Sequence, residues 1–150
     1  NAETRDKVEH FVSDAISKGA KLEVGGIRPN VPGFFYPPTV LSNVPDDADC
    51  LSDEIFGPVA AIQSFTDEKE VIERSNSTEY GLVAYLYTED VRRGLKLSEK
   101  LEFGMIGLNR GLVSDPAAPF GGVKQSGLGR EGGKEGMLEF QETQYISTEW

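Results

Sequence analysis

Short apolar runs of strand length alternate with helical segments along most of this chain. The clearest run is 82–87, which is continuously apolar or aromatic and is bounded by Gly81 and the polar Thr88. Such a run is typical of a strand buried on both faces of a sheet. Residues 90–101 then show helical spacing, and 105–108 is another short apolar run. This succession predicts crossover units, and therefore an α/β fold with a mostly parallel sheet and flanking helices.

Elements of the same kind are expected on either side of this unit. A helix is expected wherever apolar residues recur every three or four positions, and a strand wherever they alternate. Thr66 or Asp67 can cap one of these helices, with Glu70 in the capping-box position behind Asp67. The proline-rich stretch 27–38 is expected to be a loop. The other expected helices are 3–18, 67–76 and about 132–140, and the other expected strands are 21–24, 39–41, 59–65 and 143–150.

The C-terminal third differs from the rest, because ten of the 17 glycines lie between Gly104 and Gly136. After it, residues 143–150 alternate like a strand that has no pairing partner nearby in the sequence. An unpaired terminal strand is a hazard unless another chain covers it. We therefore expect residues 1–142 to form the main body and 143–150 to be an oligomerisation strand that pairs with a second subunit.

Composition narrows the possible partners. The formal net charge of −10 disfavours binding to nucleic acid or to an anionic membrane. No apolar run approaches the roughly 20 residues that span a bilayer, and no signal peptide is expected at Asn1. The single cysteine, Cys50, excludes an internal disulfide and indicates a reducing, cytoplasmic compartment. With one His and one Cys, a structural zinc site is not expected.

The first candidate constellation is Glu54-Ile55-Phe56-Gly57-Pro58. A carboxylate can accept two hydrogen bonds from the paired hydroxyls of a ribose. An aromatic ring two residues later can pack against a flat heterocycle, and glycine lets the main chain approach a ligand. The ordinary interpretation is an exposed Glu, a core Phe and a loop turn, and the chemistry alone favours it.

The second constellation runs from Pro119 to Glu131 and contains Phe120, Lys124, Arg130 and several glycines. Glycines at this density imply unusual backbone angles or a close approach of main chain to another group. Part of the segment opens like a dinucleotide fingerprint, but no helix begins within it and no acidic residue follows at the required spacing. The ordinary interpretation is a tight surface loop.

Taken together, the two constellations resemble the aldehyde dehydrogenase family, in order and at the family's separation. Asn109 is a third match, because the family's strand before the glycine-rich loop ends in Asn. The resemblance covers essentially the whole chain. It implies that this chain is the C-terminal portion of the family's catalytic domain followed by its last oligomerisation strand.

The resemblance also implies roles for individual residues. Glu54 would hold the hydroxyls of the nicotinamide ribose of NAD or NADP, and Phe56 would pack beside the nicotinamide. Asn109 and Phe120 would line the channel for a small aldehyde substrate. The glycines after Phe120 would be mainly scaffold.

Within the family, residues 109–131 resemble the succinate-semialdehyde dehydrogenase branch most closely. That resemblance implies that the Ser114 hydroxyl helps to bind the substrate carboxylate, which is chemically reasonable for a hydroxyl donor. The competing interpretation makes Ser114 a turn or cap residue before Asp115-Pro116. Arg110 is left outside the site, because the branch fixes no basic residue there.

The family's oxidation begins with attack of a Cys thiolate on the aldehyde, and a Glu elsewhere acts as the base. The resemblance implies that both residues and the dinucleotide-binding domain precede this segment, so the chain alone is expected to be inactive. Cys50 is not expected to be the nucleophile, because nearby acidic residues raise a thiol pKa. No catalytic residue and no metal ligand is therefore assigned within it.

Two other interpretations stay open. The chain could be a non-catalytic folded fragment or an oligomerisation module held together by its tail strand. It could also belong to a related reductase of acyl phosphates, but the intact Glu54 and Phe56 block argues against that reaction.

Overall fold

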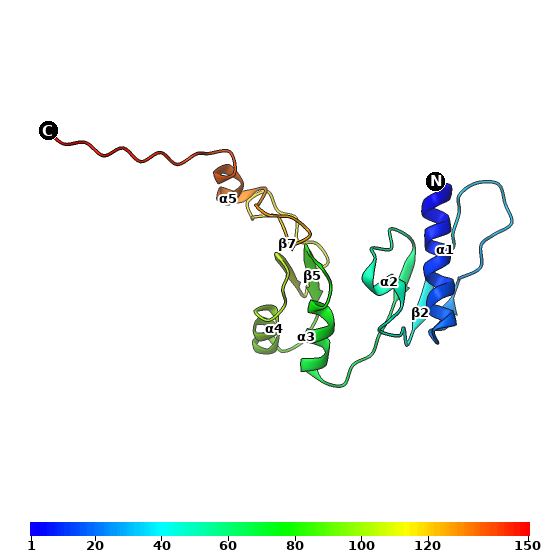
Figure 1. The fold of residues 1–150 in the computed structure, drawn as a ribbon. Helices are drawn as coiled ribbons and strands as arrows, with labels where there is room; N and C mark the ends of the chain where they lie inside the picture. Colours follow the sequence, from blue (N-terminus) through cyan, green and yellow to red (C-terminus); the bar gives the residue numbers. More distant parts are fainter. The chain divides into compact units, whose positions relative to one another are not determined.

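The computed structural model describes residues 1–150, which form two compact units, Asn1–Thr66 and Asp67–Trp150 (Figure 1). Each unit has its own helices and its own paired strands. No helix has the length and the apolar character needed to cross a membrane.

The first unit is built on helix α1, Ala2–Ser17, which matches the helix expected over residues 3–18. The Asn1 side chain caps it by accepting a hydrogen bond of 2.8 Å from the Thr4 amide. Four residues at the spacing of one helical face are buried: Val8, Phe11, Val12 and Ala15. Burying each of the larger ones contributes about 1.5–3 kcal/mol. Ile16, which the sequence placed on the same face, lies at its edge and is 40% exposed.

A three-stranded sheet accompanies this helix. Strands β1 (Lys21–Val24) and β2 (Thr39–Ser42) pair antiparallel, and β2 pairs parallel with β3 (Val59–Ala61). The strand expected over 59–65 was too long: β3 ends at Ala61, although Ile62 still donates its amide to the Leu41 carbonyl at 2.9 Å and accepts the Val44 amide at 3.2 Å. The loop between β1 and β2 includes residues 27–38, where the prolines predicted a loop.

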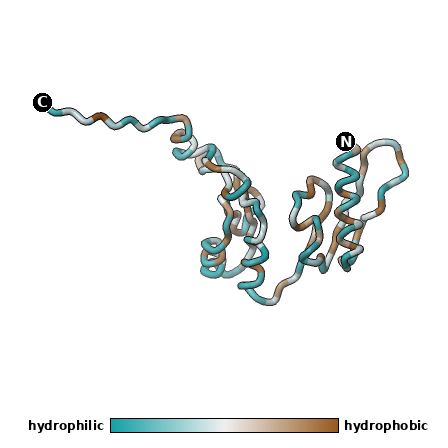
Figure 2. The backbone as a smooth tube through the Cα atoms, in the orientation of Figure 1, coloured by the Kyte–Doolittle hydropathy of each residue, from teal (hydrophilic) through white to brown (hydrophobic).

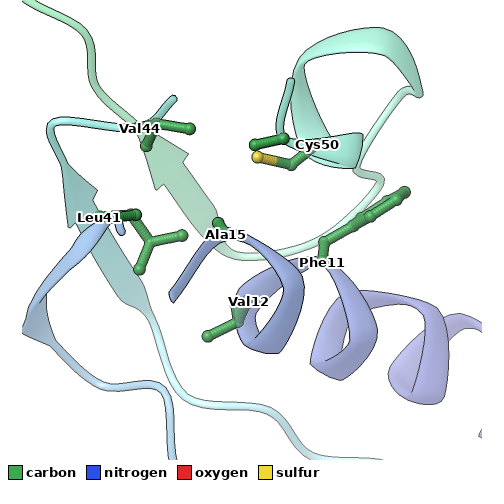
Figure 3. Close-up of a cluster of buried hydrophobic side chains, with 8 residues drawn as sticks. Phe11, Val12, Ala15, Leu41, Val44 and Cys50 are labelled. Carbon is green, nitrogen blue, oxygen red and sulfur yellow. The ribbon is translucent and has the colours of Figure 1, made fainter. Parts of the chain in front are cut away.

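The core of the first unit lies where α1, the sheet and a short helix α2, Asp49–Ser52, meet (Figure 3). Phe11, Val12 and Ala15 from α1 pack with Leu41 of β2 and Cys50 of α2. The sequence did not predict α2, because four residues are too few to show helical periodicity. Its effect is to carry the chain from the buried Cys50 to Glu54.

A partly buried polar network joins α1 to α2. The Lys18 ammonium contacts Asp14 at 2.9 Å and Asp49 at 3.0 Å, and the Asp14 carboxylate accepts the Asp49 amide at 2.9 Å. These hydrogen bonds raise the pKa of Lys18 and lower the pKa of both carboxyls. The charges therefore help to hold α2 in place.

The second unit contains a parallel crossover, as expected. Strand β5 (Val83–Leu86) leads through helix α4 (Val91–Ser98) to β6 (Met105–Leu108), which pairs with β5 in the register Val83↔Met105. Asp90 caps α4, and Asp67 caps helix α3 (Glu68–Asn76), as the sequence predicted for Asp67. The remaining elements are β4 (Tyr80–Gly81), β7 (Val123–Lys124) and α5 (Gly133–Leu138).

Two expectations for this unit were wrong in part. The run 82–87 is not buried on both faces within this chain: Tyr87 is 65% exposed, and Leu82 and Tyr85 are also exposed. The mostly parallel pairing is confirmed only in part: β5 and β6 pair parallel, as β2 and β3 do, whereas β4 and β7 pair antiparallel, as β1 and β2 do. Pairing between segments so distant in sequence leaves no local periodicity from which to predict it.

Residues 141–150 form an extended tail that belongs to none of the sheets of this chain (Figure 1). Figure 2 shows hydrophobic positions set among hydrophilic ones along it. Tyr145, Ile146 and Trp150 are all strongly exposed. The pairing of 143–150 with a second subunit stays a prediction.

Candidate functional site

In the first unit, Glu54 and Phe56 lie on the segment between α2 and β3. Both side chains are exposed, and the Phe56 ring is 74% exposed. The interpretation of Phe56 as a core residue is therefore wrong for this chain. An exposed carboxylate and an exposed ring two residues apart form an open surface on which a polar, flat ligand can bind.

The backbone of Phe56 adds a second observation. Its φ angle is +41°, which places a bulky residue in the left-handed region. That conformation costs roughly 1–2 kcal/mol for a residue other than glycine, and burial of the ring does not offset this cost here. Strained residues held at an exposed position are typical of ligand-binding sites.

Gly57 explains how the segment keeps this conformation. A Cβ atom at Gly57 would overlap a methyl group of Val8, which is buried on α1. The close approach that the sequence predicted for this glycine is therefore to the helix behind the segment. It lets the segment lie directly on α1, with Phe56 directed away from the core.

Cys50 lies four residues before Glu54 but belongs to the core (Figure 3). Burial, and to a lesser degree the charges of Asp14 and Asp49, raise the pKa of its thiol. Since the thiolate is the nucleophilic form, a buried and protonated thiol reacts slowly. The geometry agrees with the expectation that Cys50 is chemically inert.

In the second unit, Asn109, Ser114 and Phe120 all lie on the connection between β6 and β7. The structure thus places the three candidate substrate residues on one segment, which begins directly after a parallel strand. Ligands of α/β folds bind at such carboxyl ends of strands. Glu54 and Phe56 belong to the other unit.

Asn109 makes a two-point contact with the end of β5. Its Oδ1 accepts the Thr88 amide at 2.8 Å, and its Nδ2 donates to the Thr88 carbonyl at 2.8 Å. Its φ of +53° is a left-handed conformation that Asn tolerates better than most residues. Asn109 therefore joins the ends of two strands, in addition to any contact it makes with a substrate.

Replacing Asn109 with alanine should lower the free energy of unfolding of the second unit by about 2 kcal/mol, because two hydrogen bonds and a residue suited to left-handed backbone are lost. Urea denaturation would measure the change. Asn109→Asp keeps an acceptor for the Thr88 amide, so its free energy of unfolding should lie between those of the parent and of Asn109→Ala. An alanine variant as stable as the parent would show that the clamp on Thr88 contributes nothing.

Ser114 is exposed and lies just before a turn. That turn is closed by Asp115, whose Oδ1 accepts the Ala117 amide at 2.9 Å and whose carbonyl accepts the Ala118 amide at 3.0 Å. The cap that the competing interpretation assigned to Ser114 is thus supplied by its neighbour. The Ser114 hydroxyl faces solvent on the segment that also carries Asn109.

Phe120 is half-buried and held through its backbone. It exchanges two main-chain hydrogen bonds with Glu131, of 2.6 and 2.7 Å. The Arg130 guanidinium donates to the Gly122 carbonyl at 2.8 Å and to the Gly129 carbonyl at 2.6 Å. The segment from 120 to 131 is therefore a closed loop with fixed ends.

The glycines of this loop allow main chain to pack directly on main chain. A Cβ at Gly104, just before β6, would overlap the Gly121 carbonyl oxygen, and one at Gly122 would come within 3.1 Å of the Gly81 carbonyl oxygen. The sequence predicted a close approach, and the partner is the protein's own backbone. These contacts among Gly81, Gly104, Gly121 and Gly122 hold the backbone directly after Phe120.

The sequence did not single out the residues that hold the loop. Ser126 Oγ accepts the Gly81 amide at 3.0 Å, and Lys124 Nζ donates to carbonyls at the end of α3. Polar residues between glycines are expected in any surface loop, so no signal in one sequence would have separated these from the others.

The chain is similar to known proteins in both sequence and structure. A family model described as "Aldehyde dehydrogenase family" matches residues 1–146. A succinate-semialdehyde dehydrogenase of Paenarthrobacter nicotinovorans is 53% identical, with 97% of this chain and 32% of that protein covered. A glutarate-semialdehyde dehydrogenase of Pseudomonas aeruginosa is 49% identical, with 93% and 29% covered.

Solved structures agree with the sequence relatives. An aldehyde dehydrogenase of Brucella melitensis biovar abortus superposes with a TM-score of 0.92 at 49% identity, covering 97% of this chain and 30% of that one. A Mycobacterium tuberculosis aldehyde dehydrogenase complexed with NAD+ superposes with a TM-score of 0.85 at 40% identity, covering 93% and 29%. The chain thus spans about a third of the length of the curated relatives that it matches.

Proposed function

Because the chain belongs to the aldehyde dehydrogenase family, we propose that it forms part of an NAD(P)+-dependent enzyme that oxidises a semialdehyde to the carboxylic acid. Within that enzyme it would supply contacts to the cofactor, part of the wall of the substrate channel and a strand for assembly. The isolated chain is expected to be inactive, because its one thiol is buried in the core.

The observation that carries this proposal is the conformation of Phe56. A bulky ring that is exposed and held in left-handed backbone has no role in the core. A flat ligand packed on the ring would give that strained position a function. Glu54, two residues before it, is an exposed carboxylate able to accept hydrogen bonds from both hydroxyls of a ribose.

These two residues fit a nicotinamide nucleotide. Glu54 would hold the nicotinamide ribose, and Phe56 would pack beside the nicotinamide. NAD(P)+ accepts the hydride that leaves the aldehyde carbon. In these roles neither residue would contact the part of the cofactor that differs between NAD and NADP, so both nucleotides are used in the experiments proposed below. The reducing, cytoplasmic compartment expected from the sequence stays a prediction.

The proposed substrate is succinate semialdehyde or a similar semialdehyde. Two of the relatives are named for semialdehydes with a terminal carboxylate. The exposed Ser114 hydroxyl would donate to that carboxylate, and Asn109 and Phe120 would line the channel. A carboxylate on the substrate is therefore expected to improve binding.

Substrate comparison tests this proposal on the enzyme that carries the chain. We expect kcat/KM for succinate semialdehyde to exceed that for butanal by about tenfold or more, because butanal lacks the carboxylate that a polar site would recognise. Reduction of NAD+ and of NADP+ would be followed separately. Equal rates with both aldehydes would refute carboxylate recognition, and no nucleotide reduction with any aldehyde would refute the dehydrogenase.

We also propose that residues 143–150 pair with a second copy of the chain. Tyr145, Ile146 and Trp150 are exposed, and pairing would cover them. Deleting residues 143–150 should therefore reduce the mass in solution, measured by light scattering, to that of a smaller assembly. A mass unaffected by the deletion would show that other surfaces assemble the protein.

A further inference from the structure

Lys124 is a backbone outlier in the loop that carries Phe120. It lies in strand β7 with a φ of +56°, in the left-handed region that lysine rarely adopts. A residue stays in such a conformation only where the surrounding structure holds it there. The contacts of its side chain identify what holds it.

The Lys124 ammonium uses all three of its donors on groups at the end of α3 and in the turn before β6. It donates to the Asn76 carbonyl at 2.8 Å and to the Thr78 carbonyl at 3.1 Å, and it forms an ion pair of 2.8 Å with Glu102. An ammonium has three N–H donors, so this set satisfies it completely. Because the helix dipole favours a positive charge at the C-terminal end of a helix, the ammonium also interacts favourably with the end of α3.

Asn76 extends the same junction. Its Nδ2 donates to the Lys100 carbonyl at 2.8 Å, and its Oδ1 accepts the Glu102 amide at 2.9 Å. The end of α3, the turn before β6 and strand β7 are therefore joined by one connected set of polar contacts. Lys124 is the only member of this junction that comes from the glycine-rich loop.

The junction anchors strand β7, which pairs with β4. Lys124 pairs with Tyr80 and Val123 pairs with Gly81, which brings Gly122 against the Gly81 carbonyl. Phe120 lies two residues before Gly122 in the chain. A shift of β7 by one position would therefore move Phe120 relative to β6 and to Asn109.

We propose that Lys124 is a positioning residue for the aldehyde site: its ammonium, bound at the end of α3, holds strand β7 in register on β4, and Phe120 thereby keeps its place in the substrate channel. The inference rests on the proposed function, because Phe120 has a substrate to contact only in a dehydrogenase. In this proposal Lys124 acts on the site through Phe120 and does not itself contact the substrate.

Two measurements on the enzyme that carries this chain test the proposal, each on Lys124→Met, Lys124→Arg and the control Lys134→Met. Lys134 is an exposed lysine on α5. Hydrogen exchange of the segment containing Phe120 and Glu131 should become about tenfold faster in Lys124→Met, since hydrogen bonds to a charged group are lost. Lys124→Arg should restore most of the protection, and Lys134→Met should match the parent.

Steady-state kinetics provide the second measurement. In Lys124→Met the KM for succinate semialdehyde should rise about tenfold or more while the KM for the nucleotide stays unchanged, because displacing a positioning contact affects the substrate that it orients. A merely structural role would lower the amount of active enzyme and leave both KM values as they were. Lys124→Arg should recover part of the aldehyde KM.

The possible failures are distinguishable. Parent-like exchange and an unchanged aldehyde KM in Lys124→Met would overturn the inference and leave the proposed function standing. A parent enzyme without activity toward any aldehyde would overturn the proposed function, and with it the role of Phe120. Should Lys124→Met fail to fold, Glu102→Ala removes one of the three acceptors and should give smaller changes in the same directions, whereas no change would also overturn the inference.

Discussion

Replacing Gly104 with alanine should lower the free energy of unfolding of the second unit by about 3 kcal/mol, the upper end of the range for inserting one carbon into a closely packed site. The added Cβ would overlap the Gly121 carbonyl oxygen and come within 2.8 Å of the Gly122 Cα. Both are backbone atoms, so no side chain can rotate away to relieve the overlap. Urea denaturation followed by circular dichroism would measure the loss.

Gly111→Ala is the matched control. A Cβ there meets only the Tyr87 hydroxyl, at 3.6 Å, which is ordinary van der Waals contact. The midpoint of urea denaturation of Gly111→Ala should stay close to that of the parent protein. If Gly104→Ala were as stable as Gly111→Ala, the backbone of the loop would not pack on β6 as described, and Phe120 would lack its support.

Glu54→Gln should reduce kcat/KM of the complete enzyme by about tenfold to a hundredfold, the range expected for losing hydrogen bonds to a charged acceptor. The amide keeps the size of the side chain but has one acceptor oxygen in place of two. Since Glu54 is exposed and lies outside the core, thermal stability should stay unchanged. Steady-state kinetics with NAD+ and NADP+ would show the loss with whichever nucleotide the enzyme uses.

Asp53→Asn is the control for this change. Asp53 is an exposed carboxylate one position earlier, so its replacement removes the same charge from the same segment. We expect it to leave kcat/KM within a few-fold of the parent value. Equal losses in the two variants would mean that the net charge of the segment matters and that Glu54 has no individual role.

Much of the secondary structure could be predicted from local patterns. The face of α1 follows from apolar residues three and four positions apart, and the start of α3 follows from the capping carboxylate of Asp67. The crossover through α4 follows from two apolar runs with a helix between them. All of these depend on residues that are close together in the chain, where spacing alone carries the information.

The candidate site could be located from sequence but its construction could not. Glu54 and Phe56 stand out as a pair of residue types suited to a ribose and a flat ring. Nothing in that pattern indicates that Phe56 is held in left-handed backbone, or that Gly57 lies against Val8. Likewise, Asn109 was expected beside a substrate, and its two contacts to Thr88 became visible only in the structure.

Residue types at short spacing were enough to predict the order of the main helices and strands, and the resemblance carried by residues 54–58 and 119–131 indicated the family and the candidate site residues. How the glycine-rich loop is held became visible only in the folded chain. Gly81 and Ser126 are hydrogen-bonded although 45 positions separate them, and Lys124 reaches back 48 positions to Asn76. Contacts over such separations depend on where the folded chain returns, which no local pattern records.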